Sequence, residues 1–118
     1  MDKTIAPILD VISNRRSPLA YASKPVEPEK IGALFEAARW APSSYNEQPW
    51  HFIYAVQEDQ DEFQLFLDCL LEGNRVWAKD APLLVLSVAR MNFARNNRAN
   101  RHAFHDVVRG LYRIRHST

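Results

Sequence analysis

"RWAPSSYNEQPWHF", residues 39–52, connects a helical pattern to an apolar run of the chain. The connection is rich in side chains that donate and accept hydrogen bonds, namely Ser43, Ser44, Asn46 and Gln48. Pro42 and Pro49 stiffen its two ends, so these groups are presented at little cost in ordering. Such a loop suits a flat polar heterocycle. A turn in which the same side chains satisfy their own backbone is the plainer alternative, and the residues alone favour it.

The segments on either side of this loop predict one helix and two strands. Pro28 suits a first helical position and Pro42 ends the helix, whose apolar face holds Ile31, Leu34, Phe35 and Ala38. After the loop, Trp50–Val56 is aromatic and β-branched on both alternating faces, which predicts a central strand covered on two sides. Leu83–Ala89 has the composition of a second buried strand.

Three further helices are expected from the spacing of apolar residues. A short amphipathic first helix, which stops at Ser13, holds Ile5, Ile8, Leu9 and Ile12. Another, with Gly73 as its C-terminal cap, holds Phe63, Phe66, Leu67, Leu70 and Leu71. A polar connection over residues 90–100 leads to a last helix that we expect to start between Asn97 and Asn100.

The length and composition of the chain predict one soluble globular domain. Its 118 residues include 47% apolar and 25% charged side chains, and no repeat or domain boundary interrupts them. Helices alternate with a few strands, so we expect an α/β or α+β class with one layered core over residues 1–118. Residues 1–10 lack the order of a secretory signal and the chain has a single cysteine, which predicts a cytoplasmic location.

The charge balance argues against two classes of partner. Fifteen basic and 14 acidic residues give a formal net charge of +1, too small for a nucleic-acid or acidic-membrane footprint over the whole surface. No apolar run approaches the roughly 20 residues that span a bilayer. Any recognition that depends on charge is therefore expected to be local.

Two other short stretches could carry binding chemistry. In "NRRSP", residues 14–18, the guanidinium groups of Arg15 and Arg16 and the hydroxyl of Ser17 could bind a phosphate. Composition alone favours a solvated basic turn at that place. In "EGNRVWAKDAP", residues 72–82, the amide of Asn74 could donate to and accept from the imide edge of a flavin or pyrimidine. A helix-capping role for Asn74 is the plainer alternative.

Three other features favour structural or solvent-exposed roles. His102 and His105 have helical spacing, but no further ligands complete a metal site, so none is predicted. Cys69 lies beside the apolar stripe of its helix and is expected to be a buried structural thiol. An RNA-binding role is disfavoured because no recognition motif accompanies the basic cluster of Arg90, Arg95, Arg98, Arg101, Arg109, Arg113 and Arg115.

Four stretches in this order resemble the FMN-dependent nitroreductase family. They are "RRS" at residues 15–17, "APSSYNEQPWHF" at 41–52, "EGN" at 72–74 and "NRHAFHDV" at 100–107. The second is the specific one, because a serine pair followed by Asn-x-Gln-Pro-Trp after a helix is hard to reach by chance. The resemblance implies an α+β fold, a three-layer α/β/α sandwich that is incomplete at the C-terminus.

The resemblance also implies a homodimer with FMN bound between two subunits. Arg15, Arg16 and Ser17 would bind the phosphate and ribityl region, and Asn74 the pyrimidine edge of the ring. The loop would approach the flavin from the partner subunit through Ser43, Ser44, Asn46 and Gln48. The implied activity is a ping-pong reduction of nitroaromatics, quinones or related small electrophiles by NADH or NADPH, with the chemistry on the flavin rather than on a catalytic side chain.

Two departures from the family pattern lead to a second hypothesis. Leu19 stands where relatives usually have a basic residue, and residues 108–118 drop the family's helix pattern, as in a C-terminally truncated member. For such a chain we expect weak or absent FMN binding and little NAD(P)H oxidation. The alternative function is therefore an inactive family member that acts as a dimerising or binding module.

Overall fold

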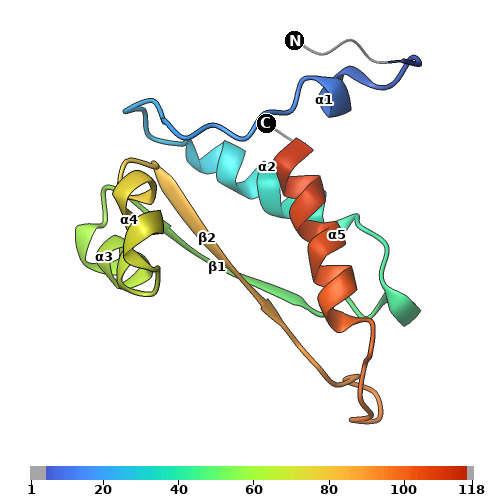
Figure 1. Ribbon diagram of the computed structural model, residues 1–118. Coiled ribbons are helices and arrows are strands. Elements are labelled where there is room, and N and C mark those ends of the chain that lie inside the picture. The colour runs from blue at the N-terminus through green and yellow to red at the C-terminus, as the bar shows by residue number, and fades with distance from the viewer. Residues whose placement is uncertain (1–4, 117–118) are drawn as a thin grey trace.

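The computed structural model describes residues 5–116 and places two long strands between two groups of helices (Figure 1). Its elements are α1 (Asp10–Ser13), α2 (Pro28–Arg39), the 3₁₀ turn η1 (Ser44–Asn46), β1 (Trp50–Val56), α3 (Gln60–Asp68), α4 (Glu72–Ala78), β2 (Leu83–Ala89) and α5 (Ala103–His116). Both strands have the bounds that the sequence predicts. Residues 1–4 and 117–118 lie outside the described residues. They belong to the two end segments discussed above, residues 1–10, which lack the order of a secretory signal, and residues 108–118, which drop the family's helix pattern.

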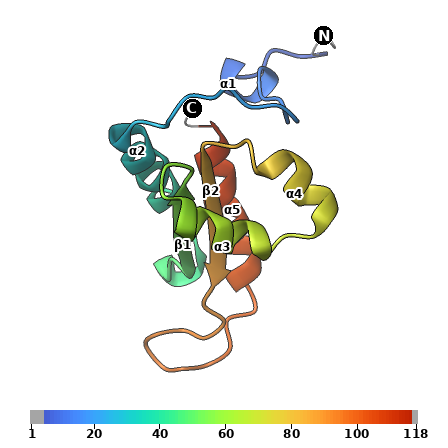
Figure 2. The same cartoon turned by 90° about the vertical axis from the view of Figure 1, so that its left-hand side faces the viewer.

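The two strands form an antiparallel ladder whose one face is covered by α2 and α5. Trp50 lies opposite Ala89 at one end of this ladder. Side chains alternate along a strand, so Trp50, Phe52 and Tyr54 share a face. The ring of Phe35 on α2 lies against those of Phe52 and Tyr54, with centroids 5.6 and 5.5 Å apart. Figure 2 shows α5 behind the strands and α3 in front of them.

The opposite face of the strands carries a small apolar core at one end. Phe63 and Leu67 of α3 pack there with Ala55 and Ala78, and Leu84 borders the cluster. Helices thus lie on both faces of the strands, and the predicted α/β/α layering is confirmed. The core is modest because two of its four buried members are alanines.

The expectation of a central strand is wrong for the part of the chain that the structure describes, and the expected cover on two sides is only partial there. There β1 pairs with β2 alone, so each strand has one free edge. The nine residues of α3 reach only one end of the sheet, which leaves Ile53 51% and Leu86 48% exposed. An apolar composition predicted both strands correctly but overestimated how much covers them.

Helix α2 agrees closely with its sequence pattern. Pro28 is its first residue, and Ile31, Leu34 and Ala38 are buried on the face toward the core. The helix ends at Arg39, three residues before Pro42, because the residue before a proline is held away from helical angles. The apolar face of α2 therefore packs against both α5 and the strands.

Three other expectations for helices need correction. The first helix spans only Asp10–Ser13, because Pro7 interrupts the apolar pattern that precedes it. This short helix buries none of its residues. Gly73 is not a cap: α3 ends before Cys69, and Gly73 lies in the first turn of the separate helix α4. The last helix begins at Ala103 rather than between 97 and 100.

Two smaller findings complete the fold. Cys69 is exposed rather than buried, and its Sγ lies 3.3 Å from the backbone oxygen of Leu65. Within residues 5–116, no helix is both long enough and apolar enough to cross a bilayer.

We predict that Gly32→Ala stabilises the protein by about 0.5–1 kcal/mol, because glycine in a helix interior loses more conformational freedom than alanine on folding. A Cβ at Gly32 in α2 meets nothing within 4 Å. Urea unfolding measures the gain. Gly73→Ala, which also meets nothing but lies in the first turn of α4, is the matched control and should gain less. A loss of stability at Gly32 would contradict the packing described for α2.

Candidate functional site

The segment between α1 and α2 forms one wall of a pocket, and α4 forms the other. The pocket has a volume of about 400 Å³ and is lined by Arg15, Arg16, Ser17, Pro18, Leu19, Tyr21 and Trp77. Tyr21 stacks on Trp77 of α4, with ring centroids 6.2 Å apart and an angle of 25° between the rings. This stack fixes an otherwise irregular segment against a helix.

The three polar residues of the pocket are exposed and bonded to one another. Nη1 of Arg15 donates to Oγ of Ser17 at 3.0 Å. Nη1 of Arg16 donates to the backbone oxygens of Ser13 and Arg15 at 2.9 and 2.8 Å. Each guanidinium group carries five N–H donors, so bonds from Nη1 alone leave most of its donor positions for a ligand. Two positive charges on adjacent residues make the pocket suitable for an anion.

Asn74 lies beside this pocket but not in its wall. It occupies the first turn of α4, where its backbone N–H donates to the oxygen of Leu71 at 2.9 Å, and its side chain is exposed. Trp77, three residues later, shares a side of the helix with Asn74 and does line the pocket. The structure therefore places the helix of Asn74 beside Arg15–Ser17, and the binding role of Asn74 stays a prediction.

The polar loop after α2 partly satisfies its own backbone. Oγ of Ser43 accepts the N–H of Gln48 at 3.0 Å, and Nε2 of Gln48 donates to Oδ1 of Asn46 at 3.1 Å. Tyr45, Asn46 and Gln48 have φ values of 55°, 50° and 50°. Left-handed angles are costly for side chains other than glycine and persist where surrounding contacts hold them. The loop thus has a defined conformation in which its side chains partly satisfy its own backbone, as the plainer alternative expects, and its binding role stays a prediction.

Asp106 is the residue of this region to which sequence reasoning assigned no role. It lies in the first turn of α5 and is 1% exposed. Its Oδ2 accepts the backbone N–H of Ser44 at 2.9 Å, and its Oδ1 accepts Nη1 of Arg109 at 3.3 Å. The sequence did contain a signal for this residue. Asp106 lies on the same side of the helix as the small and apolar residues Ala103, Val107 and Gly110, where an exposed aspartate is not expected.

The carboxylate of Glu36 organises the end of α2, one turn before the loop. It accepts Nη2 of Arg39 at 2.8 Å and Nε1 of Trp40 at 2.9 Å. These bonds, that of Arg39 first, lower the pKa of Glu36 to about 2. Glu36 is therefore ionised at neutral pH, and the exposed Trp40 is held against the helix.

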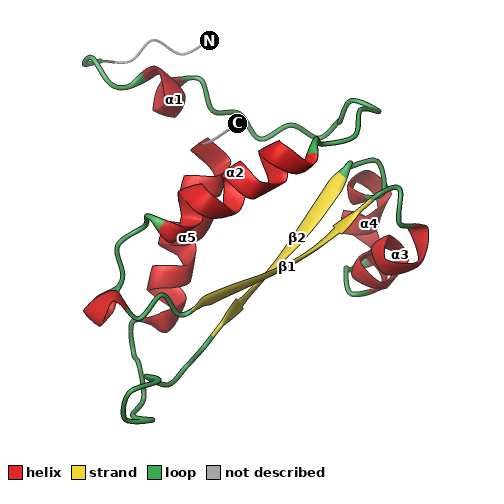
Figure 3. Cartoon of the chain, turned by 180° about the vertical axis from the view of Figure 1, so that it is seen from behind, coloured by secondary structure: helices red, strands yellow, loops and turns green. Residues whose placement is uncertain are grey.

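The structure does not bring the loop to the pocket within one chain. In Figure 1 the segment after α1 runs across the top of the molecule, whereas the loop after α2 lies at the lower right. The same two segments are apart when the molecule is seen from behind (Figure 3). Of the predicted site residues, Arg15, Arg16, Ser17 and the helix of Asn74 form one group, and the loop at 43–48 forms another.

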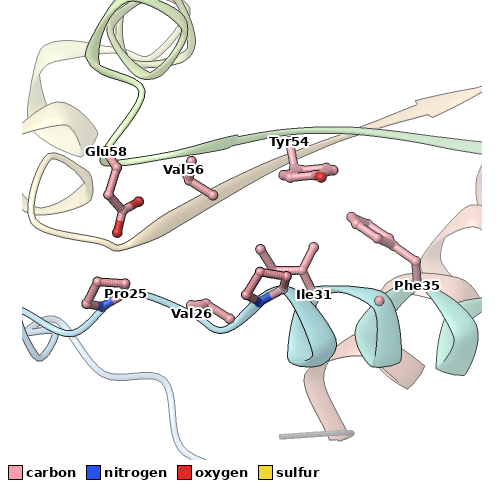
Figure 4. A pocket seen from close by; sticks show the side chains of 9 residues that line it. Pro25, Val26, Ile31, Phe35, Tyr54, Val56 and Glu58 are labelled. Carbon is pink, nitrogen blue, oxygen red and sulfur yellow. The ribbon is translucent and has the colours of Figure 1, made fainter.

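A second pocket, between α2 and β1, contains none of the predicted site residues. Its volume is about 550 Å³, and apolar side chains provide most of its wall. Figure 4 shows Tyr54 and Val56 of β1 facing Ile31 and Phe35 of α2. Glu58 is its one charged group, so this pocket offers little chemistry beyond apolar contact.

We predict that Tyr21→Ala exposes the segment of Arg15 and Arg16 to protease. An aromatic pair contributes about 0.5–1.5 kcal/mol, so its loss should raise local opening by about twofold to tenfold. Initial trypsin cleavage after these two arginines, followed by mass spectrometry, measures the change. Cleavage after Arg98, in the loop before α5, is the internal control and should not change. Equal acceleration at all three sites would indicate global destabilisation instead.

Comparison with known proteins places the chain in a family. The sequence model of the Nitroreductase family matches residues 12–81, which is more than half of the chain. The chain belongs to the nitroreductase family. The matched region contains the basic pocket segment, the polar loop and Asn74, so both groups of predicted site residues lie within the nitroreductase part of the chain.

Two curated nitroreductase relatives are similar over most of this chain. A putative NADH dehydrogenase/NAD(P)H nitroreductase of Archaeoglobus fulgidus is 31% identical over 84 residues, which are 71% of this chain and 47% of the relative. An FMN reductase [NAD(P)H] of Bacillus subtilis is 29% identical over 105 residues, 88% of this chain and 41% of the relative. The chain thus spans about half the length of the curated relatives it matches.

A solved structure confirms the nitroreductase fold. The structure of an oxidoreductase containing FMN superposes with a TM-score of 0.86 and 30% identity, over 95% of this chain and 58% of that one. Nearly all of this chain therefore superposes on somewhat more than half of that chain.

Proposed function

We propose that the protein is an FMN-dependent oxidoreductase that uses NADH or NADPH to reduce small electrophiles such as nitroaromatics or quinones. Family membership supports this proposal, as do relatives named NAD(P)H nitroreductase and FMN reductase. The observation that carries it is the pocket in which two arginines, a serine hydroxyl and a stacked tryptophan meet. This donor set is suited to a phosphate attached to a larger planar group.

The residues of the pocket fit the phosphate end of FMN. The guanidinium groups of Arg15 and Arg16 would bind phosphate oxygens, and the planar fork of arginine matches two such oxygens at once. Ser17, which already accepts from Arg15, would complete the cradle. The volume of about 400 Å³ is within the usual range for small-molecule sites.

We propose that the ring end of the site is completed by a second copy of the chain. Asn74 would bind the pyrimidine edge, since it lies one turn from Trp77 on α4. The loop at 43–48 lies apart from the pocket of its own chain (Figure 3), so a site that uses both groups needs two copies. A symmetric homodimer would form two such sites.

The chain's own residues would bind and orient, and the cofactor would supply the redox step. Bound FMN would provide two-electron transfer between NAD(P)H and the acceptor. Donors from Asn74 and the polar loop would stabilise negative charge near the ring. Donor and acceptor using one site in turn give ping-pong kinetics, so double-reciprocal plots should be parallel. The lone exposed Cys69, which has no partner cysteine in the chain, agrees with a proposed reducing cytoplasmic location.

FMN titration to millimolar concentration, followed by flavin fluorescence, tests the cofactor site. Arg15→Ala and Arg16→Ala should each weaken binding by about tenfold or more, because a hydrogen bond between charged groups contributes about 1.5–3 kcal/mol. Asn74→Ala should change the flavin reduction potential more than the affinity. Arg75→Ala, an exposed charge on the same helix, is the control. Equal small effects from all four substitutions would show that Arg15, Arg16 and Asn74 do not form the FMN site.

A binding module without turnover is the second candidate function. Leu19 in the pocket wall supports it, because an apolar side chain there leaves the phosphate one charge short of the family pattern. Sedimentation and an NAD(P)H oxidation assay with a nitroaromatic acceptor separate the two candidates. A dimer that binds no FMN at millimolar concentration would favour the module, and FMN-dependent oxidation would exclude it.

A further inference from the structure

A single buried carboxylate joins α5 to the polar loop that follows α2. Asp106 is 1% exposed, and its Oδ2 accepts the backbone N–H of Ser44 from a residue 62 positions away in the chain. Its Oδ1 accepts a hydrogen bond from Nη1 of Arg109, which lies one turn later on α5. The side chain of Arg109 is 45% exposed. Each oxygen of the carboxylate therefore has a different donor, and this fixes the plane of the group.

The loop needs external support because its backbone is strained. Three of the four residues from Tyr45 to Gln48 adopt left-handed angles. Bonds inside the loop, such as that from the N–H of Asn46 to the oxygen of Ser43 at 3.0 Å, close its turns without fixing it to the rest of the protein. Among the described residues, two hydrogen bonds made by loop side chains or amides do so: the N–H of Ser44 donates to Asp106, and the N–H of Ala94 donates to Oε1 of Glu47 at 2.6 Å.

The two anchors differ in rigidity. Glu47 reaches the exposed connection between β2 and α5, a segment without a helix or strand of its own. Asp106 belongs to α5, which packs against α2 and both strands. The ring of Tyr45 also contacts Phe93 and Arg95, but these residues lie on the same connection as the partner of Glu47. A donor held by a buried group on a packed helix has few alternative positions, so Asp106 is the more rigid anchor.

We propose that Asp106 is a positioning residue that holds the Ser43–Gln48 loop in its binding conformation. This inference rests on the proposed function, in which that loop approaches FMN from a second copy of the chain. The N–H of Ser44 is engaged by Asp106, so this amide is not available to the ligand, and binding would fall to the side chains of the loop. Asp106 itself contacts neither the ligand nor the reacting atoms.

The carboxylate is better suited to this position than its amide analogue. Both oxygens of a carboxylate accept hydrogen bonds, and here both have cationic or amide donors. An asparagine has one acceptor, so if its oxygen keeps Ser44, its NH₂ group faces the donors of Arg109. Asp106→Asn should therefore retain part of the anchor, and Asp106→Ala should remove it.

Hydrogen exchange at the Ser44 amide, followed by NMR on the full chain, measures the anchor directly. We expect exchange to accelerate about tenfold in Asp106→Ala and less in Asp106→Asn, beyond any change in global stability from urea unfolding. Val107→Ala is the matched control, because Val107 is 5% exposed on the same helix and its truncation loosens the core without touching the anchor. FMN affinity should fall in the same order, Ala more than Asn, and remain near wild type in Val107→Ala.

The outcomes separate the anchor from the proposed function. Exchange in both Asp106 variants no faster than in Val107→Ala, after correction for stability, would overturn the proposal. Faster exchange with unchanged FMN affinity and flavin spectrum would also overturn the positioning role and leave the proposed function standing. If the wild-type chain binds no FMN, the proposed function fails, and exchange still decides whether Asp106 holds the loop. Should Asp106→Ala not fold, the comparison of Asp106→Asn with Val107→Ala decides alone.

Discussion

Replacing Leu19 with arginine is expected to tighten FMN binding by about one to two orders of magnitude, the contribution of one more charged hydrogen bond. Leu19 is 77% exposed and lines the pocket with Arg15 and Arg16, so a longer polar side chain can point into it without disturbing a core. A third guanidinium would supply the basic group that the family resemblance implies at this position. Flavin fluorescence titration of both chains at equal ionic strength measures the gain.

A second leucine controls for the added charge. Leu71 is 80% exposed and lies just before α4, outside the pocket wall. Leu71→Arg changes net charge equally but offers no contact within the pocket, so its effect should be small and should vanish at high salt. If both variants tighten binding equally, the gain is non-specific, and the assignment of the phosphate to this pocket is wrong.

Phe63→Ala is expected to cost about 3–5 kcal/mol, the usual range for truncating a buried phenylalanine. Phe63 is 5% exposed at the centre of a cluster whose other members include the small side chains of Ala55 and Ala78. Neighbours this small cannot fill the space that the ring leaves. Because domains of this kind are stable by only about 5–15 kcal/mol, the variant should unfold at a much lower urea concentration.

The consequence of Phe63→Ala should extend to the pocket, since Trp77 packs against this cluster and also lines the pocket. Circular dichroism gives the unfolding midpoint, and Trp fluorescence, to which Trp77 contributes together with Trp40 and Trp50, reports in part on the pocket wall. Leu65→Ala, on the same helix but 65% exposed, should change stability by about 0.5 kcal/mol or less. A comparable loss from Leu65→Ala would show that α3 packs through a different face.

Local signals predicted the parts of the fold that local physics determines. Pro28 and the stripe of Ile31, Leu34 and Ala38 were sufficient for α2, and runs of apolar residues were sufficient for both strands. One error came where two patterns overlap in sequence. Gly73 follows an apolar stripe and reads as its cap, yet a second helix begins at Glu72.

The candidate site likewise contains some residues that the sequence indicated and others that only the structure revealed. Residue types marked Arg15, Arg16 and Ser17 as a possible phosphate site but favoured a solvated basic turn, and the family resemblance selected them. The structure places all three in the wall of one pocket, and their binding role stays a prediction. The role of Asp106 was not predictable, since its partner Ser44 is 62 residues away and only packing brings them together. The exposure of Cys69 was missed because helical periodicity gives the face of a residue but not how far the neighbouring layer extends.

Because the basic pocket and the polar loop lie apart in one chain, complementation between mutant alleles can test whether two copies share each site. If each site takes its pocket from one copy and its loop from the other, a pocket allele such as Arg16→Ala and a loop allele such as Asn46→Ala affect opposite halves of every site. A mixed dimer then contains one intact site and one doubly defective site. Two inactive alleles expressed together should complement each other to roughly a quarter of wild-type activity, because half of randomly paired dimers are mixed and each has one good site. Alleles within the same half should never complement.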